Sequence, residues 1–195
     1  MSIFITADLH LGHEAIRRHC NRPWPTLEEM DEALISNWNA TVPKRKALIY
    51  IVGDFAWKNH NRYLNRLNGK KVLIKGNHDK MSQDCLKNFS GVYERLATKI
   101  DDKVVVFDHY CGLVWNRSVH GSWLIYGHSH GRIGESETIP RCDAGVDVWG
   151  YRPVPWEAMK KKLESRIRPP FGEDSAAEAE MNVEENRRQN MAVWP

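Results

Sequence analysis

Five short stretches of this 195-residue chain place possible metal ligands directly after an apolar run. Carboxylate, imidazole and amide groups together are donors that proteins offer to divalent transition metals. Five of the nine histidines belong to these stretches, which are Asp8-Leu9-His10, Gly53-Asp54, Gly76-Asn77-His78-Asp79, His109 and Gly127-His128-Ser129-His130. The sequence therefore predicts a metal centre assembled from well-separated parts of the chain.

The spacing inside two of the stretches favours shared ligation. Alternate residues of an extended segment point to the same side, so Asp8 and His10 are predicted to face one ion together. His128 and His130 have the same spacing. One such pair is more often a surface turn than a site, so the interpretation depends on all five stretches occurring together.

Buried strands are expected to position these stretches. Residues 3–7, 47–52 and 72–74 are short apolar runs closed by turn residues, a pattern that predicts strands. Gly76 permits a sharp turn after the third run. Because open α/β sheets place their ligands at the carboxyl ends of strands, we expect the polar residues to meet at that edge.

The order of elements predicts the fold class. Helices are predicted at residues 27–38, 60–68 and 156–167, with a shorter one ending near Cys20, and Thr26 and Glu29 have the spacing of a capping box. Beyond residue 90 the pattern changes to short β runs at 92–98, 104–107 and 123–126, with Asp101-Asp102-Lys103 as a hairpin connection. We therefore predict an α/β fold in which a two-sheet β-sandwich is flanked by helices.

Length and composition predict one domain at residues 1–170, followed by a charged tail at 171–195 that is a peripheral helix or disordered. No apolar run approaches the roughly 20 residues that cross a bilayer, and Asp8 comes too early for a signal peptide. We expect a cytoplasmic protein with no membrane partner. The net charge of +3 is too small to indicate nucleic acid, and the scattered cysteines Cys20, Cys85, Cys111 and Cys142 are expected to be free thiols.

Taken in order, the five stretches resemble the signature of the calcineurin-like metallophosphoesterase superfamily, DxH…GD…GNH[DE]…H…GHxH. The resemblance runs from about residue 3 to residue 155. The segment Gly145-Val146-Asp147-Val148-Trp149, followed by Tyr151-Arg152-Pro153, is similar to small bacterial and phage members. Any one motif would be weak evidence, whereas five in family order are specific.

The resemblance implies a dinuclear centre. In the family pattern Asp8, His10, Asp54 and His130 would hold the first metal, and Asp54, Asn77, His109 and His128 the second, with Asp54 bridging. So many imidazoles suit Mn²⁺, Fe²⁺, Zn²⁺, Co²⁺ or Ni²⁺ better than Mg²⁺. We expect two divalent metal ions as cofactors, with Mn²⁺ favoured.

Charge then points to a phosphate-ester substrate. The four positive charges of two divalent ions exceed the negative charge of Asp8, Asp54 and a bridging hydroxide, and two such ions can clamp an in-line displacement at phosphorus. By the same resemblance hydroxide attacks phosphorus, and His78 protonates the leaving oxygen as general acid. Asp79 is a candidate to orient His78. The alternative for His78 is a hydrogen-bonding role without acid function.

Further substrate contacts are predicted from Asn77, and from Arg117 and His120 in a loop expected to overhang the metals. The alternative for Arg117 is a solvated loop residue. The eight tryptophans could stack on nucleobases, although tryptophan is more often a core residue. His13 is expected to be structural or solvent-facing rather than a ligand.

Two departures from relatives bear on the reaction. Asp143 stands where close relatives usually have asparagine, and an inward carboxylate there would oppose an anionic substrate. Trp57-Lys58 replace the acidic residue and arginine with which Ser/Thr protein phosphatases extend Gly-Asp. We therefore expect a phosphodiesterase acting on a cyclic nucleotide, a nucleotide derivative or a nucleic-acid end. The alternatives are a small-molecule or nucleotide phosphomonoesterase and, from another class, a non-catalytic scaffold of the same fold.

Overall fold

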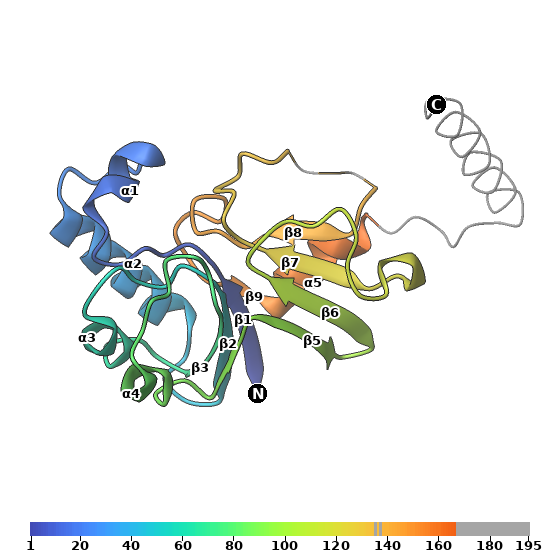
Figure 1. The fold of residues 1–195 in the computed structure, drawn as a ribbon, viewed down its shortest axis with the longest axis horizontal. Coiled ribbons are helices and arrows are strands. Elements are labelled where there is room, and N and C mark those ends of the chain that lie inside the picture. The colour runs from blue at the N-terminus through green and yellow to red at the C-terminus, as the bar shows by residue number, and fades with distance from the viewer. Residues whose placement is uncertain (135, 137, 167–195) are drawn as a thin grey trace, which may run out of the picture.

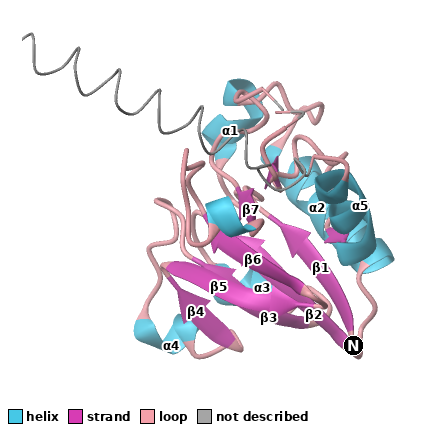
Figure 2. Cartoon of the chain, turned by 90° about the vertical axis from the view of Figure 1, so that its right-hand side faces the viewer, coloured by secondary structure: helices cyan, strands magenta, loops and turns pink. Residues whose placement is uncertain are grey.

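The computed structural model describes residues 1–134, 136 and 138–166, and within them two β-sheets face each other (Figures 1 and 2). The first sheet has the order β4-β3-β2-β1-β9 and the second the order β5-β6-β7-β8. Helices flank this sandwich, which confirms the predicted α/β class. No helix among the described residues is long and apolar enough to cross a membrane.

Four strands of the first sheet run parallel, so their carboxyl ends lie at one edge. These strands are β1 (Ser2–Thr6), β2 (Ala47–Val52), β3 (Lys70–Ile74) and β4 (Gly91–Tyr93). The short β9 (Val154–Pro155) pairs antiparallel with β1. The first three metal-ligand stretches therefore follow neighbouring parallel strands, as the sequence predicts.

The second sheet brings the last two stretches to the same region. A hairpin joins β5 (Arg95–Ile100) to β6 (Lys103–Asp108), with Asp101 at φ 51° in the predicted connection. Parallel pairing then adds β7 (Trp123–Tyr126) and β8 (Arg141–Asp143). His109 directly follows β6, and Gly127 directly follows β7.

The helices divide between two sides of the sandwich. Four pack on the face of the first sheet that points away from the second sheet (Figure 1): α1 (Glu14–His19), α2 (Leu27–Thr41), α3 (His60–Leu64) and α4 (Gln83–Leu86). The predicted cap is confirmed, because the Thr26 side chain accepts a hydrogen bond from the Glu29 N–H at 3.2 Å. The last helix, α5 (Trp156–Glu164), packs against β1, β8 and β9.

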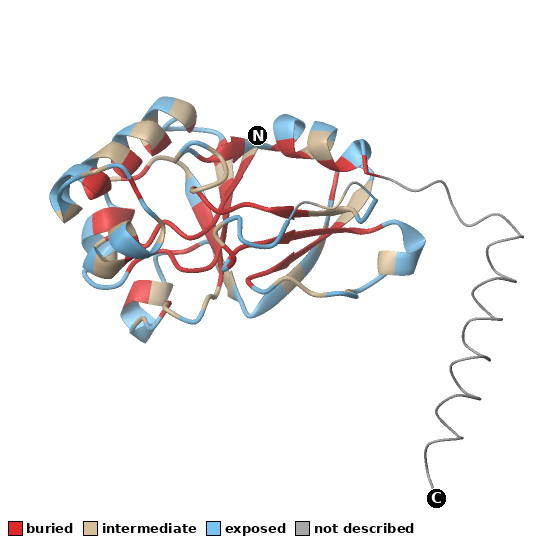
Figure 3. Cartoon of the chain, turned by 90° about the horizontal axis from the view of Figure 1, so that it is seen from above, coloured by how far each residue is buried: buried red, intermediate tan, exposed pale blue. Residues whose placement is uncertain are grey.

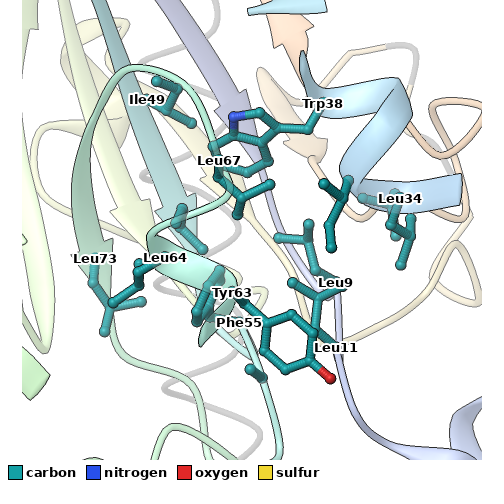
Figure 4. Packing of buried hydrophobic residues seen from close by; sticks show 14 of the residues in the cluster. Leu9, Leu11, Leu34, Trp38, Ile49, Phe55, Tyr63, Leu64, Leu67 and Leu73 are labelled. Carbon is teal, nitrogen blue, oxygen red and sulfur yellow. The ribbon is translucent and has the colours of Figure 1, made fainter. Parts of the chain in front are cut away.

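The first sheet is buried on both faces, so its strands are apolar at nearly every position. Ile49 and Ile51 pack with the helices, in a cluster that includes Trp38 of α2 (Figure 4). Tyr50 and Val52 face the second sheet, where the Tyr50 and Phe107 rings stack at 4.5 Å. Figure 3 shows buried strands between helices whose outer sides are exposed. The ligand stretches thus start from a rigid, close-packed platform.

Some element boundaries differ from those predicted. The helix predicted at 60–68 ends as α3 at Leu64, because the chain then forms tighter turns in which the Arg66 and Leu67 N–H groups bond to carbonyls three residues back. The β run predicted at 92–98 is two strands that belong to different sheets. The sequence patterns did not predict α4, β8 or β9, which are two to four residues long. The predicted end of the last helix at Ile167 and the tail at 171–195 lie outside the described residues.

Candidate metal centre

Six of the predicted ligands form two groups at the carboxyl edge of the strands. The first group is Asp8, His10 and His130, and the second is Asp54, His109 and His128. Within each group the ligand atoms lie within 4.8 Å of one another. Each group could therefore hold one metal ion.

Asp54 lies between the two groups. Its Oδ2 atom is 3.4 Å from His10 Nε2 in the first group and 3.5 Å from His109 Nε2 in the second. Asn77, the seventh predicted ligand, places its Oδ1 atom 3.1 Å from the same His109 nitrogen. A single carboxylate oxygen is thus positioned to reach ions in both groups.

Five of the six grouped residues have left-handed backbone conformations, which non-glycine residues seldom adopt. Their φ angles are 56° for Asp8, 52° for His10, 54° for Asp54, 67° for His128 and 47° for His130. Such conformations cost about 1–3 kcal/mol each and cluster at functional sites. The ligands are therefore oriented by strained loop backbone rather than by strand pleating. Asp8 and His10 nevertheless lie in one group, and His128 and His130 lie in different groups despite their spacing, which is the division that the family pattern implies.

Glycines allow the ligand loops to approach one another closely. A Cβ atom on Gly53, at φ +89°, would overlap the His109 ring, and one on Gly76 would overlap the Asp54 carboxylate. A Cβ atom on Gly127 would lie 2.7 Å from the Val52 carbonyl oxygen. The glycines of these motifs therefore provide space for the ligand side chains and backbone.

Asp79 ties two ligand loops together. Its buried carboxylate accepts hydrogen bonds, each 2.8 Å long, from the N–H groups of Asp54, Phe55 and Gly76. Among the hydrogen bonds of the described residues, none joins Asp79 to His78. The prediction that Asp79 orients the His78 ring is therefore wrong. The carboxylate instead satisfies backbone donors that irregular loops would leave unpaired.

Asp143 has the same kind of role in another loop. Its carboxylate accepts hydrogen bonds from the Ser129 hydroxyl at 2.6 Å and from the N–H groups of Gly131 and Gly145 at 2.9 and 2.7 Å. Both oxygen atoms are occupied and the residue is buried. Asp143 therefore organises the loop that carries His128 and His130.

A buried ion pair orients His130. Asp147 Oδ2 lies 2.7 Å from His130 Nδ1, and Arg22 pairs with both Asp147 oxygens at 2.8 and 2.9 Å. Arg22 also donates to the backbone carbonyls of Asp8 and Leu9. Because Nδ1–H is directed at Asp147, Nε2 is the nitrogen left for a cation. Asp147 belongs to a segment that carried the family resemblance, but no sequence signal pointed to Arg22.

The electrostatics of Asp8 and His10 in the first group fit a cation. Burial raises the pKa of Asp8 to about 7 and lowers that of His10 to about 2, so the site disfavours a carboxylate without a cation and keeps the imidazole neutral. His10 Nε2 is buried and has no hydrogen-bond partner among the described residues. A neutral imidazole nitrogen facing carboxylates is the form that binds divalent metals. The residues present therefore fit the metal ions that the donor set implies.

His78 lies beside the first group without belonging to it. Its ring centroid is 5.3 Å from that of His10, and its backbone N–H donates to Asp54 Oδ1 at 2.9 Å. The Trp57 ring is 5.3 Å from His78 and stacks on His13 at 4.4 Å. His13 Nδ1 is 3.3 Å from His10 Nδ1, which places His13 behind the predicted ligand.

Arg117 and His120 are not brought to this centre. They lie at the turn η1 (Ser118–His120), which precedes β7, whereas the ligand His128 follows the other end of β7. In Figure 1 this turn, yellow-green by the bar, lies far from the carboxyl ends of β1 and β2. The predicted overhang of the metals by this loop is therefore wrong, because the chain returns to the amino end of the second sheet before β7 begins.

A family model of calcineurin-like phosphoesterases matches residues 1–177 of the chain. The chain belongs to the calcineurin-like phosphoesterase family. The resemblance inferred from the five motifs is thereby confirmed.

Several known proteins are similar to this chain over most of its length. An uncharacterized protein of Methanocaldococcus jannaschii is 31% identical over 174 residues, covering 83% of this chain and 91% of the relative. The crystal structure of a protein of unknown function from Aquifex aeolicus is similar with a TM-score of 0.64 at 23% identity, covering 82% of this chain and 98% of that one. A solved structure of a phosphoesterase from E. coli is similar with a TM-score of 0.40 at 16% identity, covering 74% of this chain and 78% of that one. The Aquifex structure supports the fold alone.

Asp147→Asn should weaken cation binding to this protein about 10- to 100-fold. The new amide would donate to His130 Nδ1 and move the imidazole proton to Nε2, where it blocks ligation. Titration calorimetry with Mn²⁺ measures this change. Asp102→Asn, in the exposed β5–β6 turn, removes the same charge and should leave the affinity unaltered. Unchanged affinity in Asp147→Asn would contradict ligation by His130 Nε2.

Proposed function

We propose that this phosphoesterase hydrolyses phosphodiesters at a centre of two divalent cations. The observation that carries the proposal is the position of Asp54 Oδ2, 3.4 Å from His10 Nε2 and 3.5 Å from His109 Nε2. It joins two donor groups into one site. Asp8, His10 and His130 would hold one cation, and His109, His128 and Asn77 the other, with Asp54 shared.

The donor set supports metal-dependent chemistry on an anion. The imidazoles contribute no negative charge, so the carboxylates of Asp8 and Asp54 leave excess positive charge when two divalent ions bind. When bound, the cations supply Lewis acidity toward the phosphate ester and promote ionisation of a water nucleophile. An imidazole-rich set favours Mn²⁺, Fe²⁺, Zn²⁺, Co²⁺ or Ni²⁺.

This chain's own residues supply the proton. Hydrolysis forms a bond between a water oxygen and phosphorus and breaks the bond to the ester oxygen that leaves. His78 is assigned to protonate that oxygen, because its ring adjoins His10 yet it belongs to neither ligand group. The side chain is only partly buried, so it can regain a proton from solvent. Its backbone N–H, held by Asp54 Oδ1, keeps the residue beside the centre.

The preference for diesters rests on Trp57 and Lys58. They stand where Ser/Thr protein phosphatases have an acidic residue and an arginine, and Trp57 packs against His13 and His78. An aromatic side chain there favours a substituent on the ester over the bare oxygens of a phosphomonoester. The monoesterase alternative lacks a comparable observation in its favour.

The experiment pairs metal analysis with two substrates. Purified protein loaded with Mn²⁺ should contain two ions per chain and should release nitrophenolate from bis(p-nitrophenyl) phosphate faster than from p-nitrophenyl phosphate. Faster cleavage of the monoester would reverse the preference. Two bound ions without cleavage of either ester would favour the non-catalytic scaffold.

A further inference from the structure

One exposed aromatic side chain adjoins each of the two ligand groups. Trp57 is 43% exposed and Tyr110 is 50% exposed. Elsewhere in the described residues tryptophans such as Trp38, Trp123 and Trp156 are buried, as expected for large apolar side chains. Packing of the core therefore does not account for Trp57 or Tyr110.

Trp57 belongs to the side of the first group. Its ring stacks on His13 with an angle of 9° between the planes, and it lies 5.3 Å from His78. Its N–H donates to the Leu11 carbonyl at 2.8 Å, which ties its backbone to the loop that carries His10. The ring is thus held in place beside the residue assigned to protonate the leaving oxygen.

Tyr110 belongs to the side of the second group. Its ring centroid is 5.0 Å from that of His109 and 4.8 Å from that of His128. Its N–H donates to the Asp108 carboxylate at 3.0 Å, and its hydroxyl lies 3.5 Å from Asn77 Oδ1. Tyr110 therefore contacts two candidate ligands, Trp57 contacts His78 beside the first group, and both rings still expose surface to solvent.

We propose that the substrate is a phosphodiester with a planar ring on each side of the phosphate, as in a dinucleotide or single-stranded nucleic acid. Trp57 stacks on the leaving substituent and Tyr110 on the retained one. The direction follows from His78, since the leaving oxygen must be on the side of its proton donor. This inference rests on the proposed function and adds the substrate class.

Stacking on an aromatic side chain contributes about 1–3 kcal/mol for each base and tolerates different bases, because every base has a π-face. The two rings would therefore select for planar substituents rather than for base sequence.

Two diesters with the same leaving group test the assignment of Tyr110. Both bis(p-nitrophenyl) phosphate and methyl p-nitrophenyl phosphate release nitrophenolate, but only the first retains a ring. The measured quantity is kcat/KM for bis(p-nitrophenyl) phosphate divided by kcat/KM for methyl p-nitrophenyl phosphate. The two diesters differ in intrinsic reactivity by the same factor in every variant, so a change in this ratio from the wild-type value reports the contribution of the retained ring. Tyr110→Leu should lower that ratio about fivefold or more, whereas Tyr110→Phe should keep it near the wild-type value.

Trp57 should behave differently, because both diesters place a ring on the leaving side. Trp57→Leu should lower kcat/KM for both diesters about fivefold or more, mainly through KM, and Trp57→Phe should restore most of it. Ratios that stay unaltered in Tyr110→Leu, or a Trp57→Leu enzyme with wild-type KM, would overturn the proposal.

Competition against bis(p-nitrophenyl) phosphate separates the two sources of such a ligand. Equal inhibition by thymidylyl-thymidine and by oligothymidylate indicates a dinucleotide, and tighter inhibition by oligothymidylate indicates a single strand. Thymidine monophosphate inhibiting as tightly as either would overturn the two-ring assignment.

If metal-loaded wild-type protein cleaves no phosphate ester, the proposed function itself fails. If wild-type protein cleaves diesters and Asp54→Asn abolishes that cleavage, an unmoved ratio in Tyr110→Leu together with a wild-type KM in Trp57→Leu contradicts only this inference.

Discussion

Asp54→Asn is expected to lower turnover at least about a thousandfold and to deplete both cation positions. Asp54 Oδ2 is the atom between His10 Nε2 and His109 Nε2, and the amide would present N–H groups there instead of a negative charge. The substitution should not disturb the backbone, since asparagine tolerates the left-handed conformation that Asp54 adopts at φ 54°. Bound Mn²⁺ is measured by elemental analysis after dialysis, alongside diester hydrolysis.

The control for this variant is Asp84→Asn, which removes the same charge from an exposed position on α4. It should retain wild-type metal content and activity. Thermal unfolding in the presence of a chelator checks that Asp54→Asn has kept its fold. Two fully occupied cation positions in Asp54→Asn would show that this carboxylate is not shared between the two groups.

His78→Ala should lower turnover about 100- to 10,000-fold for diesters with a poor leaving group, while metal content stays at the wild-type value. The His78 ring contacts His10 and Trp57, and His78 is a member of neither of the two ligand groups. The variant also keeps the backbone N–H of residue 78, which donates to Asp54. Kinetics with a dialkyl or dinucleoside phosphate measure the effect.

The leaving group itself provides the control for general acid catalysis. Nitrophenolate is a stable anion and needs little protonation, so His78→Ala should impair bis(p-nitrophenyl) phosphate hydrolysis much less than dinucleoside phosphate hydrolysis. An equal loss with both leaving groups would point instead to a role for His78 in positioning the substrate.

The candidate ligands were predictable because the motifs that carry them begin where apolar runs stop. Asp8, Asp54 and Asn77 follow three parallel strands of the first sheet, and His109 and His128 follow strands of the second. Local periodicity is sufficient to locate such strand ends. Local periodicity does not locate β8 and β9, because these strands are only three and two residues long. They are stabilised by pairing with strands that are distant in the sequence.

The roles of Asp79, Asp143 and Arg117 were predicted incorrectly or left open, for one physical reason. Each depends on where a side chain points once loops from different strands meet. Asp79 and Asp143 were considered for effects on catalysis or substrate, but their carboxylates bind backbone N–H groups of the ligand loops. Arg117 was placed over the metals because it lies between two motifs in sequence, yet its loop returns to the amino end of β7.

The identity and order of the donors, and with them the family, could be read from the linear chain, because residue types and spacing are local properties. Tertiary structure alone shows the left-handed backbone that separates His128 from His130, which no periodicity encodes, whereas their division between the two groups was already implied by the family pattern. It also decided that Arg22 supports the centre, through a contact with Asp147 that spans 125 positions. Likewise, only the folded chain places Trp57 and Tyr110 at the two ligand groups, because their packing partners come from other strands.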